Sequence, residues 1–176
     1  MPKAESSGTA AKGKSRPRRP KRVNEPIEIA GNVVPPGERH RFDLPAARLP
    51  TGSTISLPVV VVNGSHPGPN LWLSAAVHGD EVNGVEIIGQ VLDRTKPGEL
   101  HGCLIATPIV NVFGFNAQSR YLPDRRDLNR SFPGSARGSL AGRLAHLFVS
   151  EVVRKCQFGV DLHTGSNHRT NLPQIR

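Results

Sequence analysis

The sequence predicts an α/β domain with a mixed, partly parallel sheet flanked by helices. Apolar runs of strand length alternate with segments whose apolar residues recur at helical spacing, which is the pattern of βαβ units. One run, residues 71–77, is apolar almost throughout, as expected for a strand covered on both faces. At 176 residues the chain is long enough for one domain with a hydrophobic core and short for two.

The first predicted elements are extended. Between residues 26 and 50, short apolar alternation is interrupted by prolines and Gly37, which predicts edge strands or an extended lead-in. Residues 56–62 are rich in valine and predict a strand. Asn63-Gly64 and then residues 66–69 predict a turn. The strand over 71–77 should then lie in the middle of the sheet.

Two helices are predicted between the later strands. From residue 82 to 92 the apolar residues follow a helical period, which ends before Pro97-Gly98. Residues 104–110 predict the next strand. Ser139 is a candidate N-cap for a second helix with an apolar stripe over residues 140–152, and residues 158–162 predict the last strand.

The basic charge of the chain is concentrated in its first 22 residues. These contain eight Lys/Arg and one acid, so they carry +7 of the formal net charge of +9. Their Pro, Ser, Gly and Ala content without apolar periodicity predicts a disordered basic tail over 1–22, with the domain over 23–176. The tail could contact polyanions such as nucleic acid or acidic lipid, but a solvated extension is the favoured interpretation.

Other features favour a cytoplasmic protein. No continuous apolar stretch of signal-peptide type is present, and no segment approaches the roughly 18 apolar residues of a membrane span. Cys103 and Cys156 form no Cys-x-x-Cys motif, and we expect both to be small core residues in a reducing compartment. The sequence gives no indication of oligomeric state.

Two histidines and a glutamate have the spacing of metal ligands. His78 and Glu81 lie three residues apart after a predicted buried strand, and His163 follows the last predicted strand. Together they would form the three protein ligands of an open catalytic zinc site. Gly79 would let the backbone turn sharply and approach an ion, and Asp161 would place a second carboxylate near it. Strand carboxyl ends are where ligands gather in such sheets.

The remaining histidines have no partner at ligand spacing, and we assign them to surface or core: His40, His66, His101, His146 and His168. The segment 119–134 is unusual because it contains four arginines in eleven residues. Guanidinium groups bind carboxylates bidentately, so this loop predicts a small-molecule substrate with a free carboxylate. A phosphate-binding loop is the competing interpretation, but no Gly-rich cradle of the usual spacing is present.

Three motifs occur in order: His78-Gly79-Asp80-Glu81, Asp127-Leu128-Asn129-Arg130 and Asp161-Leu162-His163. Over roughly residues 55–170 the chain thereby resembles the succinylglutamate desuccinylase/aspartoacylase family, the acylase branch of the zinc carboxypeptidase-like fold. The resemblance implies that His78, Glu81 and His163 bind Zn2+. It implies an enzyme that cleaves the amide of an N-acyl amino acid, with water activated by zinc as the nucleophile.

The resemblance also implies roles for the arginine-rich loop. Asp127 would accept a hydrogen bond from His78 and fix its tautomer. Asn129 and Arg130 would bind the substrate carboxylate. Arg120 would stabilise the oxyanion that develops on the scissile amide. The stretch between Arg120 and Asp127 is slightly longer than in aspartoacylase, so Arg125 or Arg126 could share the role of Arg120.

Three other functions stay open. A carboxypeptidase-like peptidase would use the same Asn129-Arg130 pair at a peptide end. A metal-binding pseudoenzyme would retain the ligands and lack a general base. A third possibility is that the basic tail tethers the domain to a polyanion.

The general base is the element of the family that the sequence does not supply. The family places this glutamate well downstream of the last zinc ligand, and Glu86, Glu99 and Glu151 lie on predicted helices or turns with no reason to face the metal. We therefore expect the chain to be the amino-terminal part of a hydrolase domain truncated at its C-terminal side, with the base beyond Arg176. Alone it should be poorly soluble and nearly inactive, because a shortened sheet exposes an edge.

Overall fold

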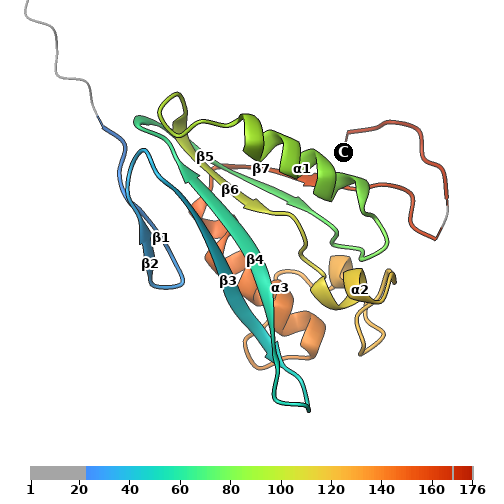
Figure 1. The fold of residues 1–176 in the computed structure, drawn as a ribbon. Helices are drawn as coiled ribbons and strands as arrows, with labels where there is room; N and C mark the ends of the chain where they lie inside the picture. The colour runs from blue at the N-terminus through green and yellow to red at the C-terminus, as the bar shows by residue number, and fades with distance from the viewer. Residues whose placement is uncertain (1–22, 168, 176) are drawn as a thin grey trace, which may run out of the picture.

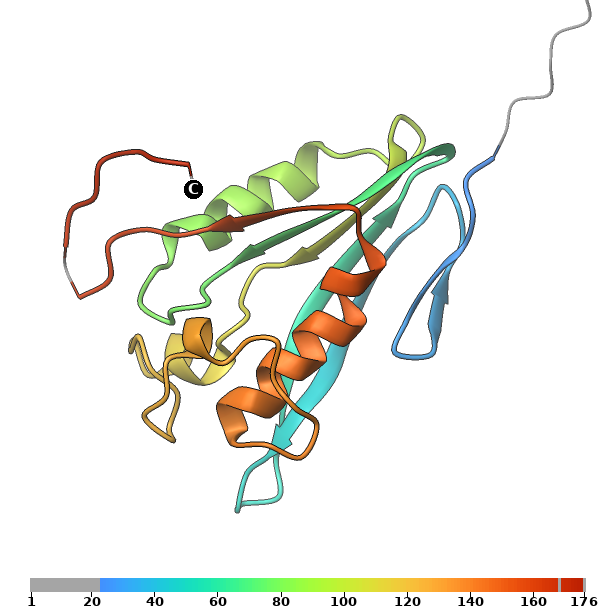
Figure 2. The same ribbon diagram turned by 180° about the vertical axis from the view of Figure 1, so that it is seen from behind.

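The computed structural model describes residues 23–167 and 169–175 (Figure 1). The predicted disordered tail, residues 1–22, lies outside the described residues, and so does His168. Within the described part, helices lie on both faces of one sheet, and a separate small hairpin lies beside it (Figures 1 and 2).

The predicted mixed sheet is confirmed. Five strands pair in the order β3-β4-β6-β5-β7. Their bounds are Arg39–Arg48 for β3, Thr54–Asn63 for β4, His66–Ala75 for β5, His101–Thr107 for β6 and Phe158–Leu162 for β7. The pairs β3-β4 and β4-β6 are antiparallel, whereas β5 is parallel to both of its neighbours, β6 and β7.

The extended lead-in is also confirmed, because β3 is an edge strand and is preceded by the antiparallel hairpin of β1 (Ile27–Ile29) and β2 (Asn32–Val34). The turn predicted over residues 66–69 is wrong, since these residues begin β5 with irregular pairing to β6. A β-carbon on Gly68 would lie 2.6 Å from the backbone nitrogen of Gly102, so the two backbones pass very close there. The glycine and prolines that suggested a turn instead permit this contact.

The strand predicted for the middle of the sheet is β5. It is paired on both sides, but the central position belongs to β6. The alternating residues of β5 face two separate clusters. Leu73 and Ala75 pack with α1, whereas Trp72 packs with α3. This burial on both faces explains the nearly continuous apolar run.

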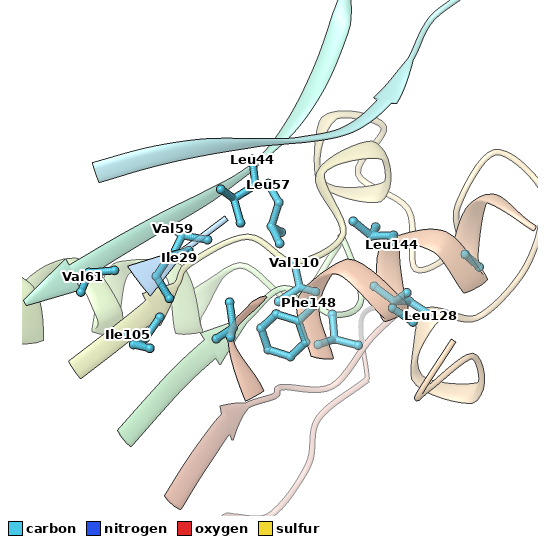
Figure 3. Close-up of a cluster of buried hydrophobic side chains, with 14 of the residues drawn as sticks. Ile29, Leu44, Leu57, Val59, Val61, Ile105, Val110, Leu128, Leu144 and Phe148 are labelled. Carbon is cyan, nitrogen blue, oxygen red and sulfur yellow. The ribbon is translucent and has the colours of Figure 1, made fainter. Parts of the chain in front are cut away.

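Both predicted helices are present, one on each face of the sheet (Figures 1 and 2). Helix α1 (Asn83–Arg94) buries Ile88 and Leu92 against one face. Helix α3 (Leu140–Glu151) buries Leu144 and Phe148 against the other, within the cluster drawn in Figure 3. Ser139 is the N-cap of α3, as predicted, and its hydroxyl accepts a hydrogen bond from the Gly142 amide at 3.1 Å.

Short helices in the connection from β6 to α3 were not predicted. Helix α2 (Val112–Asn116) is capped by Asn111, whose side chain accepts a hydrogen bond from the Gly114 amide at 2.8 Å. The 3₁₀ helix η1 (Leu128–Arg130) is capped by Asp127 and anchored by the fully buried Leu128. Elements this short contain too few residues to display a helical period.

The chain changes sides of the sheet at β5. Helix α1 leads from β5 to β6 on one side, and the chain then returns through α2, η1, α3 and the 3₁₀ helix η2 (Val153–Lys155) to β7 on the other side. In α/β sheets, ligands bind outside the strand carboxyl ends at points where the strand order reverses in this way. The carboxyl ends of β5 and β7, which lie side by side, are therefore the expected place of a functional site.

Two further expectations concern the body of the domain. Cys103 is buried in the core and Cys156 packs against the same cluster; both are free thiols, and burial raises the pKa of each to about 12. Cys103 is thus a core residue, as predicted, whereas Cys156 is partly buried at the border of the core. Among the described residues, none of the helices has the length and apolarity to cross a bilayer.

Candidate metal centre

The three predicted ligands lie at the carboxyl ends of two neighbouring parallel strands. His78 and Glu81 follow β5, in a turn where the Glu81 amide donates to the His78 carbonyl oxygen at 3.1 Å. His163 comes directly after β7. Ala75 and Leu162 are partners at the ends of these strands, so the two segments leave the sheet side by side. Residues 82 positions apart in the chain thereby share one site.

The side chains converge on the Glu81 carboxylate. His78 Nδ1 lies 2.7 Å from Glu81 Oε1, and His163 Nδ1 lies 2.8 Å from Glu81 Oε2. One candidate ligand atom from each residue can be chosen so that all lie within 4.8 Å of one another. His78 and Glu81 are both 3% exposed. This is a nitrogen–nitrogen–oxygen donor set of the kind that holds divalent transition metals.

The far nitrogen of each imidazole faces a carboxylate. His163 Nε2 lies 2.7 Å from Asp161 Oδ2. His78 Nε2 lies 3.3 Å from Asp127 Oδ1, without the alignment of a hydrogen bond, and this buried atom has no hydrogen-bond partner within residues 23–167 and 169–175. Asp161 therefore lies behind His163, on the side away from Glu81, rather than beside the convergence point. This arrangement of carboxylates behind histidine ligands is common at metal sites.

Electrostatics at the convergence point favour positive charge. Burial alone would raise the pKa of Glu81, but hydrogen bonds from His163, His78 and the Thr164 amide lower it from 4.5 to about 2. Hydrogen bonds to Asp161 and Glu81 raise the pKa of His163 from 6.5 to about 10, although burial opposes the shift. The cluster thus holds an ionised Glu81 carboxylate, and His163 binds a proton strongly between Asp161 and Glu81. A divalent cation would satisfy the same demand for charge.

Arg120 joins this cluster from the loop that precedes η1. Its guanidinium donates to Asp127 Oδ2 from Nη2 at 2.9 Å, and its Nη1 lies 3.7 Å from Glu81 Oε1. Burial would raise the pKa of Asp127, but hydrogen bonds from Arg120 and from the Asn129 amide, together with the nearby His78, lower it below its usual value. Arg125 and Arg126 are exposed, and Arg126 pairs loosely with Asp124 at 3.9 Å.

The Asn129-Arg130 pair lies in η1, next to this ion pair. The Asn129 backbone amide donates to Asp127 Oδ1 at 2.9 Å, which ties the helix start to the carboxylate facing His78. Asn129 is half-buried and Arg130 is exposed. The backbone of the pair is therefore anchored beside the cluster through Asp127.

The glycine of the His78-Gly79-Asp80-Glu81 motif has a different function from the one expected. Gly79 is not among the residues with positive φ. A β-carbon at this position would lie 1.9 Å from the carbonyl carbon of Gly114, in α2. Gly79 therefore allows the backbone of α2 to pack directly against the ligand turn.

The three glutamates considered as general bases contact other groups. Glu86 is exposed on α1 and accepts from Gln90 at 3.0 Å. Glu99 pairs with Lys96 at 3.2 Å, and Glu151 accepts from the Ala30 amide at 2.7 Å. These contacts lie outside the cluster, as expected from the sequence.

One polar contact of the site was not anticipated. Ser74, on β5, donates a hydrogen bond from Oγ to Asp161 Oδ1 at 2.6 Å. The available signal was that Ser74 is the one polar residue in the apolar run 71–77. Buried hydroxyl groups need a partner, so an isolated serine in such a run indicates a polar neighbour on an adjacent strand.

Comparison with known proteins gives consistent results. A family model described as the succinylglutamate desuccinylase/aspartoacylase catalytic domain matches residues 67–176. The N-alpha-acetyl-L-2,4-diaminobutyric acid deacetylase of Halomonas elongata is 30% identical over 151 residues, which are 84% of this chain and 44% of that protein.

Solved structures with similar folds carry names from the same family. The succinylglutamate desuccinylase/aspartoacylase of Rhodobacter sphaeroides is 37% identical with a TM-score of 0.65, over 72% of this chain and 40% of that one. The product-bound ectoine utilization protein EutE (DoeB) of Ruegeria pomeroyi is 28% identical with a TM-score of 0.67, over 82% and 44%. The zinc carboxypeptidase-like fold predicted from the sequence is thereby confirmed. The chain spans less than half the length of these relatives.

Proposed function

Because the chain belongs to the succinylglutamate desuccinylase/aspartoacylase family, we propose that it supplies the zinc-binding part of a hydrolase that cleaves the amide of an N-acyl amino acid. The family consists of deacylase- and desuccinylase-type amidohydrolases, and a deacetylase is among the relatives. The observation that carries the proposal is the convergence of His78 Nδ1 and His163 Nδ1 on the two oxygens of the buried Glu81 carboxylate.

We assign the metal to His78, Glu81 and His163. The donor set fits zinc, since imidazole nitrogen and carboxylate oxygen are its usual ligands in catalytic sites, and three protein ligands leave one position for water. Zinc bound there would acidify a water molecule and polarise the amide carbonyl. Asp127 and Asp161 would keep the two imidazoles oriented through their far nitrogens.

We assign the substrate to the arginine-rich loop. Arg120 touches both Glu81 and Asp127, so its guanidinium is held close to the ligands and can stabilise negative charge that develops on the amide oxygen. Asn129 and Arg130 would bind the free carboxylate of the substrate, with their backbone fixed by the Asp127 cap. The two free thiols support a cytoplasmic location.

The first test is metal binding by the purified chain. After removal of metal with a chelator, we expect one zinc ion per chain, measured by equilibrium dialysis with elemental analysis. His78→Ala should weaken binding by at least about 100-fold, because it removes one of three ligands. His40→Ala is the matched control, since His40 lies on β3, away from the cluster, and pairs with Glu38, so its loss should leave the affinity unchanged. Equal binding by wild type and His78→Ala would contradict the proposed centre.

The second test is catalysis by the zinc-loaded protein. Release of free amine from N-acyl amino acids, lost in Arg120→Ala, would support the deacylase function. Cleavage of peptides but not of N-acyl amino acids would favour a carboxypeptidase-like enzyme instead. Zinc binding that depends on His78 without either activity would fit both a metal-binding pseudoenzyme and a hydrolase part that needs a general base from elsewhere, so it would not decide between these two.

A further inference from the structure

Ser74 belongs to a row of polar side chains that crosses the parallel part of the sheet. Its partners in the strand register are Thr107 on β6 and Asp161 on β7, at the carboxyl ends of the strands. Ser74 and Thr107 are both 0% exposed. The two hydroxyls differ in one respect: Ser74 Oγ contacts Asp161, whereas Thr107 Oγ1 has no hydrogen-bond partner among the described residues.

The contact of Ser74 continues into the metal centre. Ser74 Oγ donates to Asp161 Oδ1 at 2.6 Å, and Asp161 Oδ2 lies 2.7 Å from His163 Nε2. On the other side of the same ring, His163 Nδ1 lies 2.8 Å from Glu81 Oε2. One chain of polar contacts therefore runs from Ser74 inside the sheet through Asp161 and His163 to the Glu81 carboxylate.

The hydroxyl of Ser74 restricts a carboxylate that would otherwise rotate. The terminal torsion of aspartate is broad, so a contact to one oxygen alone leaves the plane of the group poorly fixed. Bonds to both oxygens of Asp161 fix that plane, with Oδ2 aimed at His163 Nε2. A proton held on Nε2 leaves the lone pair of Nδ1 for a metal.

We propose that Ser74 is a positioning residue that acts through Asp161 to orient His163 for metal binding. The inference rests on the proposed zinc centre and adds to it a residue from inside the sheet. Its contribution is specific to Ser74, because the equally buried Thr107 hydroxyl in the same row makes no such contact.

The test compares zinc affinity across matched variants of the whole chain, by competition with a chromophoric chelator. Ser74→Ala should weaken zinc binding by about tenfold, at the lower end of the range for groups that orient metal ligands. Thr107→Val removes the other buried hydroxyl of the row and should leave the constant within about twofold. In an Asp161→Ala background, Ser74→Ala should have no further effect, because its route to His163 has been removed.

A second readout separates positioning from a general loss of structure. The absorption spectrum of the cobalt-substituted chain reports ligand geometry and should change in Ser74→Ala but not in Thr107→Val. An unchanged zinc constant in Ser74→Ala, or equal losses in Ser74→Ala and Thr107→Val, would overturn this inference while leaving the proposed function intact. Failure of the wild-type chain to bind zinc at His78 would overturn both.

Discussion

At the scale of single residues, a steric constraint beside the candidate metal centre is the absence of a side chain at Gly79. Its backbone lies against that of Gly114, so a β-carbon would collide with main-chain atoms that cannot rotate away. The ligand turn and helix α2 can approach each other only while this position is glycine.

We expect Gly79→Ala to destabilise the chain by at least about 2 kcal/mol, because one of two packed backbones must shift. The same variant should bind zinc more weakly, since the shift displaces the neighbouring His78. Urea denaturation and the zinc competition assay measure the two effects.

Gly89 provides the control for this substitution. It lies in α1, where a β-carbon would meet nothing within 4 Å. Gly89→Ala should therefore stabilise the chain, by up to about 1 kcal/mol from helix propensity. Equal unfolding free energies for the two variants would show that the close contact between Gly79 and Gly114 does not determine the stability of the chain.

The sequence indicated His78, Glu81 and His163 because all three follow predicted strands, and the carboxyl ends of parallel strands meet at one edge. The prediction that Asp161 lies near the ion was wrong, because Asp161 contacts the far nitrogen of His163, on the side away from Glu81. Which side of His163 it occupies depends on how the side chain turns after β7, which sequence spacing does not determine. Ser74 was overlooked because its partner comes from β7, 87 residues away, and strand neighbours of that kind are not visible in a linear sequence.

At the scale of elements, α3 is the helix that was best defined in advance. The candidate N-cap Ser139 and the apolar stripe both predicted a helix that starts near residue 140. The structure places Leu144 and Phe148 of this helix in the core. Element β5 was predicted to start too late because Gly68 and two prolines resemble a turn, although here they accompany a close approach to β6. Helix α2 and η1 are short and are held by caps and tertiary contacts rather than by periodicity.

The N-cap of α3 gives a prediction at this scale. Ser139→Ala should lower the free energy of unfolding by about 1 kcal/mol, because the Gly142 amide loses its acceptor. Ser150→Ala, in the last turn of the same helix, should change the free energy by no more than about 0.5 kcal/mol. Chemical denaturation of both variants measures the difference. A loss at Ser150 as large as that at Ser139 would contradict the capping argument.

At the scale of the whole molecule, the two edge strands of the sheet, β3 and β7, differ in length. Strand β3 is long and paired along one side with β4, while β7 is short and pairs only with β5 within the described part of the chain. Phe158 is 61% exposed and Val160 is 45% exposed on β7. An apolar edge with free backbone groups favours association with other chains.

We expect the purified chain to self-associate through this edge. Sedimentation velocity should show species larger than a monomer that increase with concentration, and Val160→Lys should reduce them. Val33→Lys is the control, because Val33 is 55% exposed on the separate hairpin. A wild-type chain that stays monomeric at all concentrations would refute the prediction.

The placement of the three ligands also affects the order of events during synthesis. A ribosome releases the segment with His78 and Glu81 long before it releases His163, and the third ligand reaches the first two only when β7 aligns beside β5. If these residues bind a metal as proposed, the nascent polypeptide would until then offer two of the three ligands and would bind the ion weakly. Tight binding of the cation would require that β7 has paired with β5. The onset of tight metal binding would therefore mark the completion of folding.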